Sequence, residues 1–108
     1  MMNYNEMSDF EINCEVLSVF SPDIKHMCLS GDNSCFYDCG PAGDGWNQID
    51  IPDYCNNPAD AWPIIVENRI RLNPVLYTKW MAEDYLENTS SSNTNPLRAA
   101  MIVFLMMQ

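Results

Sequence analysis

The chain has few positively charged residues. Only five of its 108 residues are Lys or Arg, against fifteen Asp or Glu, which gives a formal net charge of −10. Binding to a DNA or RNA backbone, or to an anionic membrane surface, requires clustered cations. The composition therefore argues against direct contact with nucleic acid or with a membrane. Two interpretations of the acidic excess stay open: plain solubility, or imitation of a nucleic-acid surface that blocks a basic partner.

Long apolar runs and secretory signals are also missing. The longest apolar stretch, Ala99 to Met107, is too short to cross a bilayer. The polar and acidic start, Met1 to Asp9, has neither the basic segment nor the apolar run that is typical of a signal peptide. We therefore expect a cytoplasmic protein, and a chain of this length is expected to form one domain over residues 1–108.

Residues that commonly support catalysis are scarce. His26 is the only histidine, and no nucleophile motif surrounds any Ser or Cys. The glycine-containing stretch 40–45 lacks the lysine of a phosphate-binding loop. The sequence therefore predicts neither an enzyme nor a cofactor. A metal-assisted hydrolase that uses Asp44, Asp50 and Asp53 remains an alternative.

The five cysteines allow two further interpretations. Their odd number in a cytoplasmic protein argues against a disulfide framework. A zinc site from His26 and three of the cysteines would lack the closely spaced Cys pair that is typical of zinc sites. We therefore predict buried free thiols and no metal. The cysteines are Cys14, Cys28, Cys35, Cys39 and Cys55.

The residues that are present predict an α+β fold. Ser8 and Glu11 form a capping-box pattern at the start of an apolar stripe, which predicts a helix over residues 8–20. Residues 24–29 and 34–39 are predicted as two strands of a hairpin, because turn-forming residues lie between them. Residues 40–57 combine glycines, prolines and polar residues, and are predicted to form a long loop.

The second half of the chain contains the same helix-start signal twice. Asn57-Pro58 and Asn95-Pro96 each combine an N-cap residue with a proline at the first helical position. Between them, residues 70–72 and 75–81 are predicted as strands joined at Asn73-Pro74, and 87–95 as a polar loop. Residues 97–107 are apolar on nearly every side, which predicts a central helix. The overall expectation is a small, mainly antiparallel sheet packed against two to three helices, with the C-terminal helix buried.

Three segments resemble the NinX-like family of lambdoid phage accessory proteins. They are MSDFEIN (Met7 to Asn13), NNPADAWPIIVENRI (Asn56 to Ile70) and NPLRAAMIVFLMMQ (Asn95 to Gln108). Residues 22–50 and 83–94 are not covered. The resemblance implies a phage-encoded protein in an infected bacterial host and, by analogy with such accessory genes, a role against host defence.

The helix starts are candidate binding sites for an anion. Backbone N–H groups at a helix N-terminus attract phosphate, and Arg98 adds a cation in the first turn of the last helix. Tryptophan and tyrosine side chains supply flat surfaces for stacking. Alternatively, Trp62 and Trp80 belong to the core and Arg98 solvates a helix end. The predicted ligand-binding residues are Trp46, Tyr54, Asn57, Trp62, Asn95 and Arg98.

These observations favour a protein that binds without catalysis. The leading hypothesis is sequestration of a small nucleotide-derived immune signal, with phosphates at the helix starts and bases against the aromatic residues. One alternative is an acidic inhibitor or nucleic-acid mimic that blocks a host defence protein, and another is a small hydrolase of the same signal. The apolar helix end from Phe104 to Met107 also predicts a homodimer contact.

Overall fold

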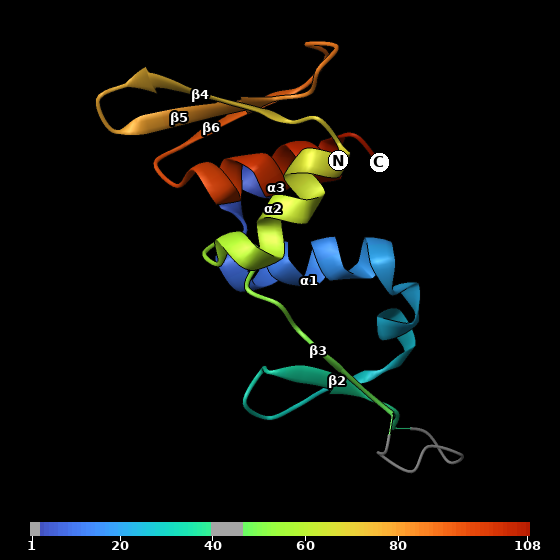
Figure 1. Ribbon diagram of the computed structural model, residues 1–108. Helices are drawn as coiled ribbons and strands as arrows, with labels where there is room; N and C mark the ends of the chain where they lie inside the picture. Colours follow the sequence, from blue (N-terminus) through green and yellow to red (C-terminus); the bar gives the residue numbers. More distant parts are fainter. Residues whose placement is uncertain (1–2, 40–46) are drawn as a thin grey trace.

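A layer of helices separates two small antiparallel sheets (Figure 1). The computed structural model describes residues 3–39 and 47–108. The described part of the chain is elongated, with principal extents of 50 × 28 × 25 Å. The predicted α+β class, with antiparallel strands packed on helices, is confirmed.

The three long helices begin where the sequence predicts. Helix α1 (Asp9–Phe20) has the full capping box, since Ser8 Oγ accepts from the Glu11 N–H and the Glu11 carboxylate accepts from the Ser8 N–H. Helices α2 (Pro58–Glu67) and α3 (Pro96–Met106) both follow an asparagine N-cap and start with proline. Local capping chemistry therefore sets all three starts.

Helix α3 forms the centre of the core. Every residue from Arg98 to Leu105 is buried. The helix contacts α1, α2 and all three strands of one sheet. This confirms the predicted central helix. The homodimer was predicted because the apolar end of this helix was expected to lie uncovered. Phe104 and Leu105 are already covered within the chain, and the Phe104 ring stacks on Phe20 with centroids 5.6 Å apart. A homodimer stays a prediction.

The sheet beside α3 has the order β4-β5-β6. Its strands are β4 (Arg71–Leu76), β5 (Lys79–Glu83) and β6 (Ser90–Asn93). The predicted break at Asn73-Pro74 is wrong, because Pro74 lies inside β4, and an edge strand tolerates the missing N–H. The predicted loop 87–95 is wrong over Ser90–Asn93, because a polar strand pairs with β5 through backbone groups whatever its side chains.

The second sheet has the order β1-β2-β3. Its short strands are β1 (Cys28–Leu29), β2 (Cys35–Tyr37) and β3 (Gln48–Asp50). The predicted strand 24–29 is wrong in its first half. There Pro22 starts a 3-10 helix, η2 (Pro22–His26), which includes His26. The predicted loop 40–57 is wrong over Gln48–Asp50, which pair with β2.

A disulfide joins Cys28 and Cys39, so the prediction of free thiols is wrong for these two residues. The physical reason is the register of the hairpin. Cys28 pairs with Tyr37, and the chain then carries Cys39 back to a Cα–Cα distance of 5.7 Å. Cys14, Cys35 and Cys55 are free, and of these Cys55 alone is fully buried.

Residues 3–39 and 47–108 contain neither a membrane-spanning helix nor a cluster of metal-binding side chains. No helix in that part of the chain is long and apolar enough to cross a membrane. Nor do the same residues bring together three or more His, Cys, Asp or Glu side chains that could hold a metal ion.

Candidate functional site

Arg98 holds the N-terminal segment against α3. Its Nη1 donates to Asp9 Oδ1 at 2.7 Å, and its Nη2 donates to the backbone carbonyls of Met7 and, at 3.3 Å, of Tyr4. These bonds fix the short 3-10 helix η1 (Tyr4–Glu6). Arg98 itself is 9% exposed. Its donors are therefore directed at the chain itself, whereas the sequence predicted a ligand there.

Both predicted anion sites are capped by the protein's own side chains. At the start of α3, Asn95 Oδ1 accepts from the Leu97 N–H at 3.0 Å and from the Arg98 N–H at 3.4 Å. At the start of α2, Asn57 Oδ1 accepts from the Ala59 N–H at 3.0 Å. The N–H groups expected to grip a phosphate thus already have acceptors.

A polar cluster links α1 to the segment before α2. Asn13 Oδ1 accepts from the Cys55 N–H at 3.0 Å, and Asn13 Nδ2 donates to Asp53 Oδ1 at 3.1 Å. Asn95 Nδ2 donates to the Cys55 carbonyl at 2.6 Å. Burial, with the charge of Asp9 as a second cause, raises the pKa of the Cys55 thiol to about 12. Cys55 is thus a neutral thiol at neutral pH and a poor nucleophile.

The predicted aromatic ligands do not come together. Tyr54 belongs to the core, and burial followed by the charge of Asp60 raises the pKa of its hydroxyl. Trp62 lies on the outer side of α2 and is 58% exposed. Trp80 is about one-third exposed, so it is not a core residue. Trp46 lies outside the described residues.

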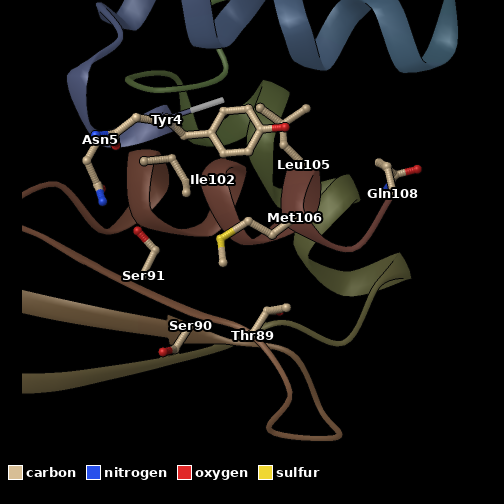
Figure 2. A pocket seen from close by; sticks show the side chains of 10 residues that line it. Tyr4, Asn5, Thr89, Ser90, Ser91, Ile102, Leu105, Met106 and Gln108 are labelled. Atoms are coloured by element: carbon tan, nitrogen blue, oxygen red, sulfur yellow. The ribbon is translucent and has the colours of Figure 1, made fainter. Parts of the chain in front are cut away.

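A cavity of about 460 Å³ is lined in part by the same N-terminal segment. Figure 2 shows its construction. Ile102, Leu105 and Met106 of α3 lie between the Tyr4–Asn5 segment and the strand end that carries Thr89 and Ser91. Its volume is within the range of roughly 300–1,000 Å³ that small-molecule sites occupy. None of the five predicted binding residues that the structure describes lines it. The lining residues are Asn3, Tyr4, Asn5, Thr89, Ser90, Ser91, Ile102, Leu105, Met106 and Gln108.

Two hydroxyl groups in the cavity wall lack a hydrogen-bond partner. They are Thr89 Oγ1 and Ser91 Oγ, both shielded from solvent, and Ser91 is 8% exposed. A buried polar group without a partner costs about 1–3 kcal/mol, and such groups are rare in native proteins. The Met106 side chain extends from α3 towards this strand (Figure 2). Since a methionine changes rotamer easily, a ligand that displaces it could reach both hydroxyls.

The turn before β6 sets the position of these hydroxyls. The Asp84 carboxylate accepts from the Asn88 N–H at 2.7 Å and from the Thr89 N–H at 3.0 Å. Ser91 then pairs with the fully buried Ala82, so its side chain lies on the face that packs against α3. The sequence contained one signal for these hydroxyls. A run of Ser and Thr long enough to form a strand precedes an apolar helix.

The described residues of the cavity wall offer hydrogen bonds and apolar surface but no charged side chain. Among its described lining residues there is no Lys, Arg, His, Asp, Glu or Cys. Metal ligation relies on such side chains, and general acid–base catalysis and phosphate binding use them most often. The arrangement can thus hold an uncharged molecule in a defined orientation.

A second exposed feature is the tip of the β4–β5 hairpin. The hairpin tip consists of Val75, Leu76 and Tyr77, which are 43%, 66% and fully exposed. Pro74 and these three residues line a shallow hollow of about 340 Å³. The tip also lies in the less acidic half of the chain, because every cation except Lys25 lies at or after Arg69.

The fold and the site together define a small α+β protein that has a ligand-sized, uncharged cavity beside its central helix. Residues 3–108 match the family model described as "Bacteriophage P22, NinX", so the chain belongs to the NinX family of phage proteins. The resemblance inferred from three segments is thereby confirmed over nearly the whole chain. No curated protein matches the chain.

A solved structure supports the fold. The chain is similar to a phage protein from Bacillus cereus ATCC 14579, with a TM-score of 0.61 and 17% sequence identity. The match covers 98% of this chain and 92% of the other. At this identity the likeness concerns the arrangement of helices and strands alone.

Proposed function

We propose that this NinX-family protein is an accessory factor that binds a small molecule in the cavity without transforming it. The single observation that carries the proposal is the pair of unpartnered hydroxyls, Thr89 Oγ1 and Ser91 Oγ, in the wall of a ligand-sized cavity. Buried groups without partners destabilise the empty protein. A ligand that supplies those hydrogen bonds would remove this cost and gain affinity from it.

The biological role that we propose is sequestration of a nucleotide-derived immune signal of the infected host. Sequestration needs affinity and shielding but no chemistry, which suits a cavity wall that has no His, Cys, Lys, Arg or carboxylate side chain among its described residues. The site differs from the one expected from the sequence. It lies at the C-terminal half of α3, whereas the helix start at Asn95 and Arg98 is capped and paired within the chain.

The test is recovery of the bound molecule. The protein is incubated with a panel of cyclic nucleotides and ADP-ribose-derived signals, separated from free compound, and heated to release what it holds. We expect a thermal shift and an intact compound by chromatography. Recovery of an altered compound would show that the protein is a hydrolase and overturn the proposal.

A matched pair of variants assigns the binding to the cavity. Met106→Trp fills the space above the hydroxyls, and we expect it to abolish the thermal shift. Val66→Trp places the same bulk on α2 at a site that is 56% exposed and outside the cavity, and it should bind as the original chain does. Equal loss in both variants would argue against the cavity as the binding site.

A second candidate function is inhibition of a host protein, and the hairpin tip favours it. A fully exposed tyrosine beside Leu76 is a common kind of anchor in protein interfaces. If this function holds, Leu76→Ser with Tyr77→Ser should abolish recovery of a host protein in pull-downs from infected cells. An acidic mimic would instead lose its target when clustered acids are neutralised, and its binding would fall steeply with salt.

A further inference from the structure

The electrostatic setting of the cavity disfavours an anionic ligand. No cationic side chain belongs to its described wall. Arg98, whose guanidinium contacts the N-terminal segment, donates to the carbonyls of Met7 and Tyr4 and to Asp9, and so is already neutralised. A phosphate in the cavity would thus lack the paired cationic side chain that phosphate sites commonly use.

The position of the cavity along α3 adds to this effect. Leu105 and Met106 lie in the last turn of the helix, where the aligned carbonyl groups give the helix end partial negative charge. One of these carbonyls, that of Phe104, accepts from Gln108 Nε2 at 2.9 Å, and the side chain of Gln108 also lines the cavity. A negative helix end and a chain of net charge −10 both oppose a phosphate here.

The polar groups of the wall suit a neutral molecule that carries both donors and acceptors. The amides of Asn3, Asn5 and Gln108 each offer a donor and an acceptor, as the edge of a heterocyclic base requires. Thr89 and Ser91 offer hydroxyls on the opposite side, where sugar hydroxyls would complete their hydrogen bonds. Ile102 and Leu105 provide apolar surface, and Tyr4 provides a ring, for the flat face of a base.

We infer that the cavity recognises the uncharged base-and-sugar part of its ligand and uses no phosphate contact. This inference rests on the proposed function and narrows its ligand class to a nucleoside, or to the nucleoside end of a larger signal whose phosphates stay in solvent. Ser91 and Thr89 then set the orientation through the sugar, and Met106 moves aside when the ligand enters.

The experiment compares uncharged and phosphorylated probes of the same shape. The four common ribonucleosides and their 5′-monophosphates are titrated into the protein at low and at physiological salt. We expect a nucleoside to bind at least as tightly as its monophosphate, with any difference smaller at the higher salt because screening shortens the reach of the net charge to about 8 Å. A monophosphate that binds tenfold more tightly than its nucleoside would overturn the inference, and so would the absence of binding by all eight probes.

Two serine variants on one strand provide the control. Ser91→Ala should weaken nucleoside binding about tenfold, the effect of losing one hydrogen bond to a buried group. Ser92→Ala changes the next residue, which is exposed and outside the cavity wall, and should leave binding unchanged. Equal affinities for Ser91→Ala and the original chain would overturn the inference.

The two proposals fail in different ways. A monophosphate that binds more tightly than its nucleoside and is recovered intact would overturn the nucleoside inference and leave the sequestration proposal standing. Recovery of an altered compound, or binding that survives Met106→Trp, would overturn the sequestration proposal.

Discussion

Ser91 and Arg98 differ in what their polar groups contribute to the stability of the fold. Ser91 occupies a position at which an apolar residue of similar size would satisfy the fold better, since its hydroxyl is buried without a partner. Arg98 instead stabilises the fold, because its guanidinium binds Asp9 and the Met7 carbonyl. A stability measurement therefore separates these two kinds of residue.

Ser91→Ala is predicted to stabilise the empty protein. Removing a buried hydroxyl that has no partner should raise the free energy of unfolding by about 1 kcal/mol. Ser92→Ala, on the exposed face of the same strand, should change it by less than about 0.5 kcal/mol. Urea denaturation of the three proteins checks this. A lower stability for Ser91→Ala would mean that the hydroxyl has a partner, and the main support for the site would be lost.

Arg98→Ala is predicted to destabilise the protein by about 2 kcal/mol. Breaking a fully buried ion pair costs roughly 3–5 kcal/mol. The expected loss is smaller here because the Asp9 side chain is 44% exposed and can be hydrated. Hydrogen exchange should rise first at residues 4–7, whose carbonyls lose their donor. Protection of residues 4–7 equal to that in the original chain would contradict the assigned role.

Because the pKa of the Cys55 thiol is raised, we expect the protein to lose stability at high pH. Its pKa in the folded chain is about 12, against an ordinary value of 9.0, so the thiolate forms more readily in the unfolded chain. Stability from this group is complete below about pH 9 and is lost as the pH rises towards 12. Thermal unfolding between pH 8 and pH 10 should show this decline, and the slope should be smaller in Cys55→Ala. Identical slopes would contradict it.

At the scale of elements, sequence patterns predicted the helices well and the strands poorly. The signals at Ser8, Asn57 and Asn95 are local, because a capping side chain bonds to N–H groups two or three residues away. β6 is held by pairing with β5, which its own residues do not signal, because its composition is that of a loop. The cavity was missed for the same reason, since three separate segments build its wall.

The disulfide is predicted to stabilise the sheet that contains it more than the helical core. Closing a loop of 11 residues restricts the unfolded chain and contributes about 2–3 kcal/mol. Reduction should therefore raise hydrogen exchange over residues 28–37, while α3 keeps its protection. The double variant Cys28→Ser, Cys39→Ser should reproduce this result. Equal loss of protection in α3 would show that the two layers unfold together.

At the scale of the whole molecule, charge and apolar surface are unevenly distributed. Most acids lie before Arg69, and the hairpin tip lies after it. A partner protein could thus meet an apolar tip at one sheet, while the acids keep the opposite half of the molecule in solution. The homodimer predicted from the sequence can be tested by light scattering, where a single 12.4 kDa species at micromolar concentration would exclude it.

The contacts of Arg98 affect how mutational data on this protein are interpreted. The backbone of Tyr4, a lining residue, is held by the Arg98 guanidinium, which does not line the cavity, so the position of this wall depends on a contact outside the cavity. In a mutational scan for activity, Arg98 would group with the ligand-contacting residues although it lies behind them. A tag fused ahead of Asn3 would act on the same wall, so assays of this protein are better designed with the tag placed elsewhere.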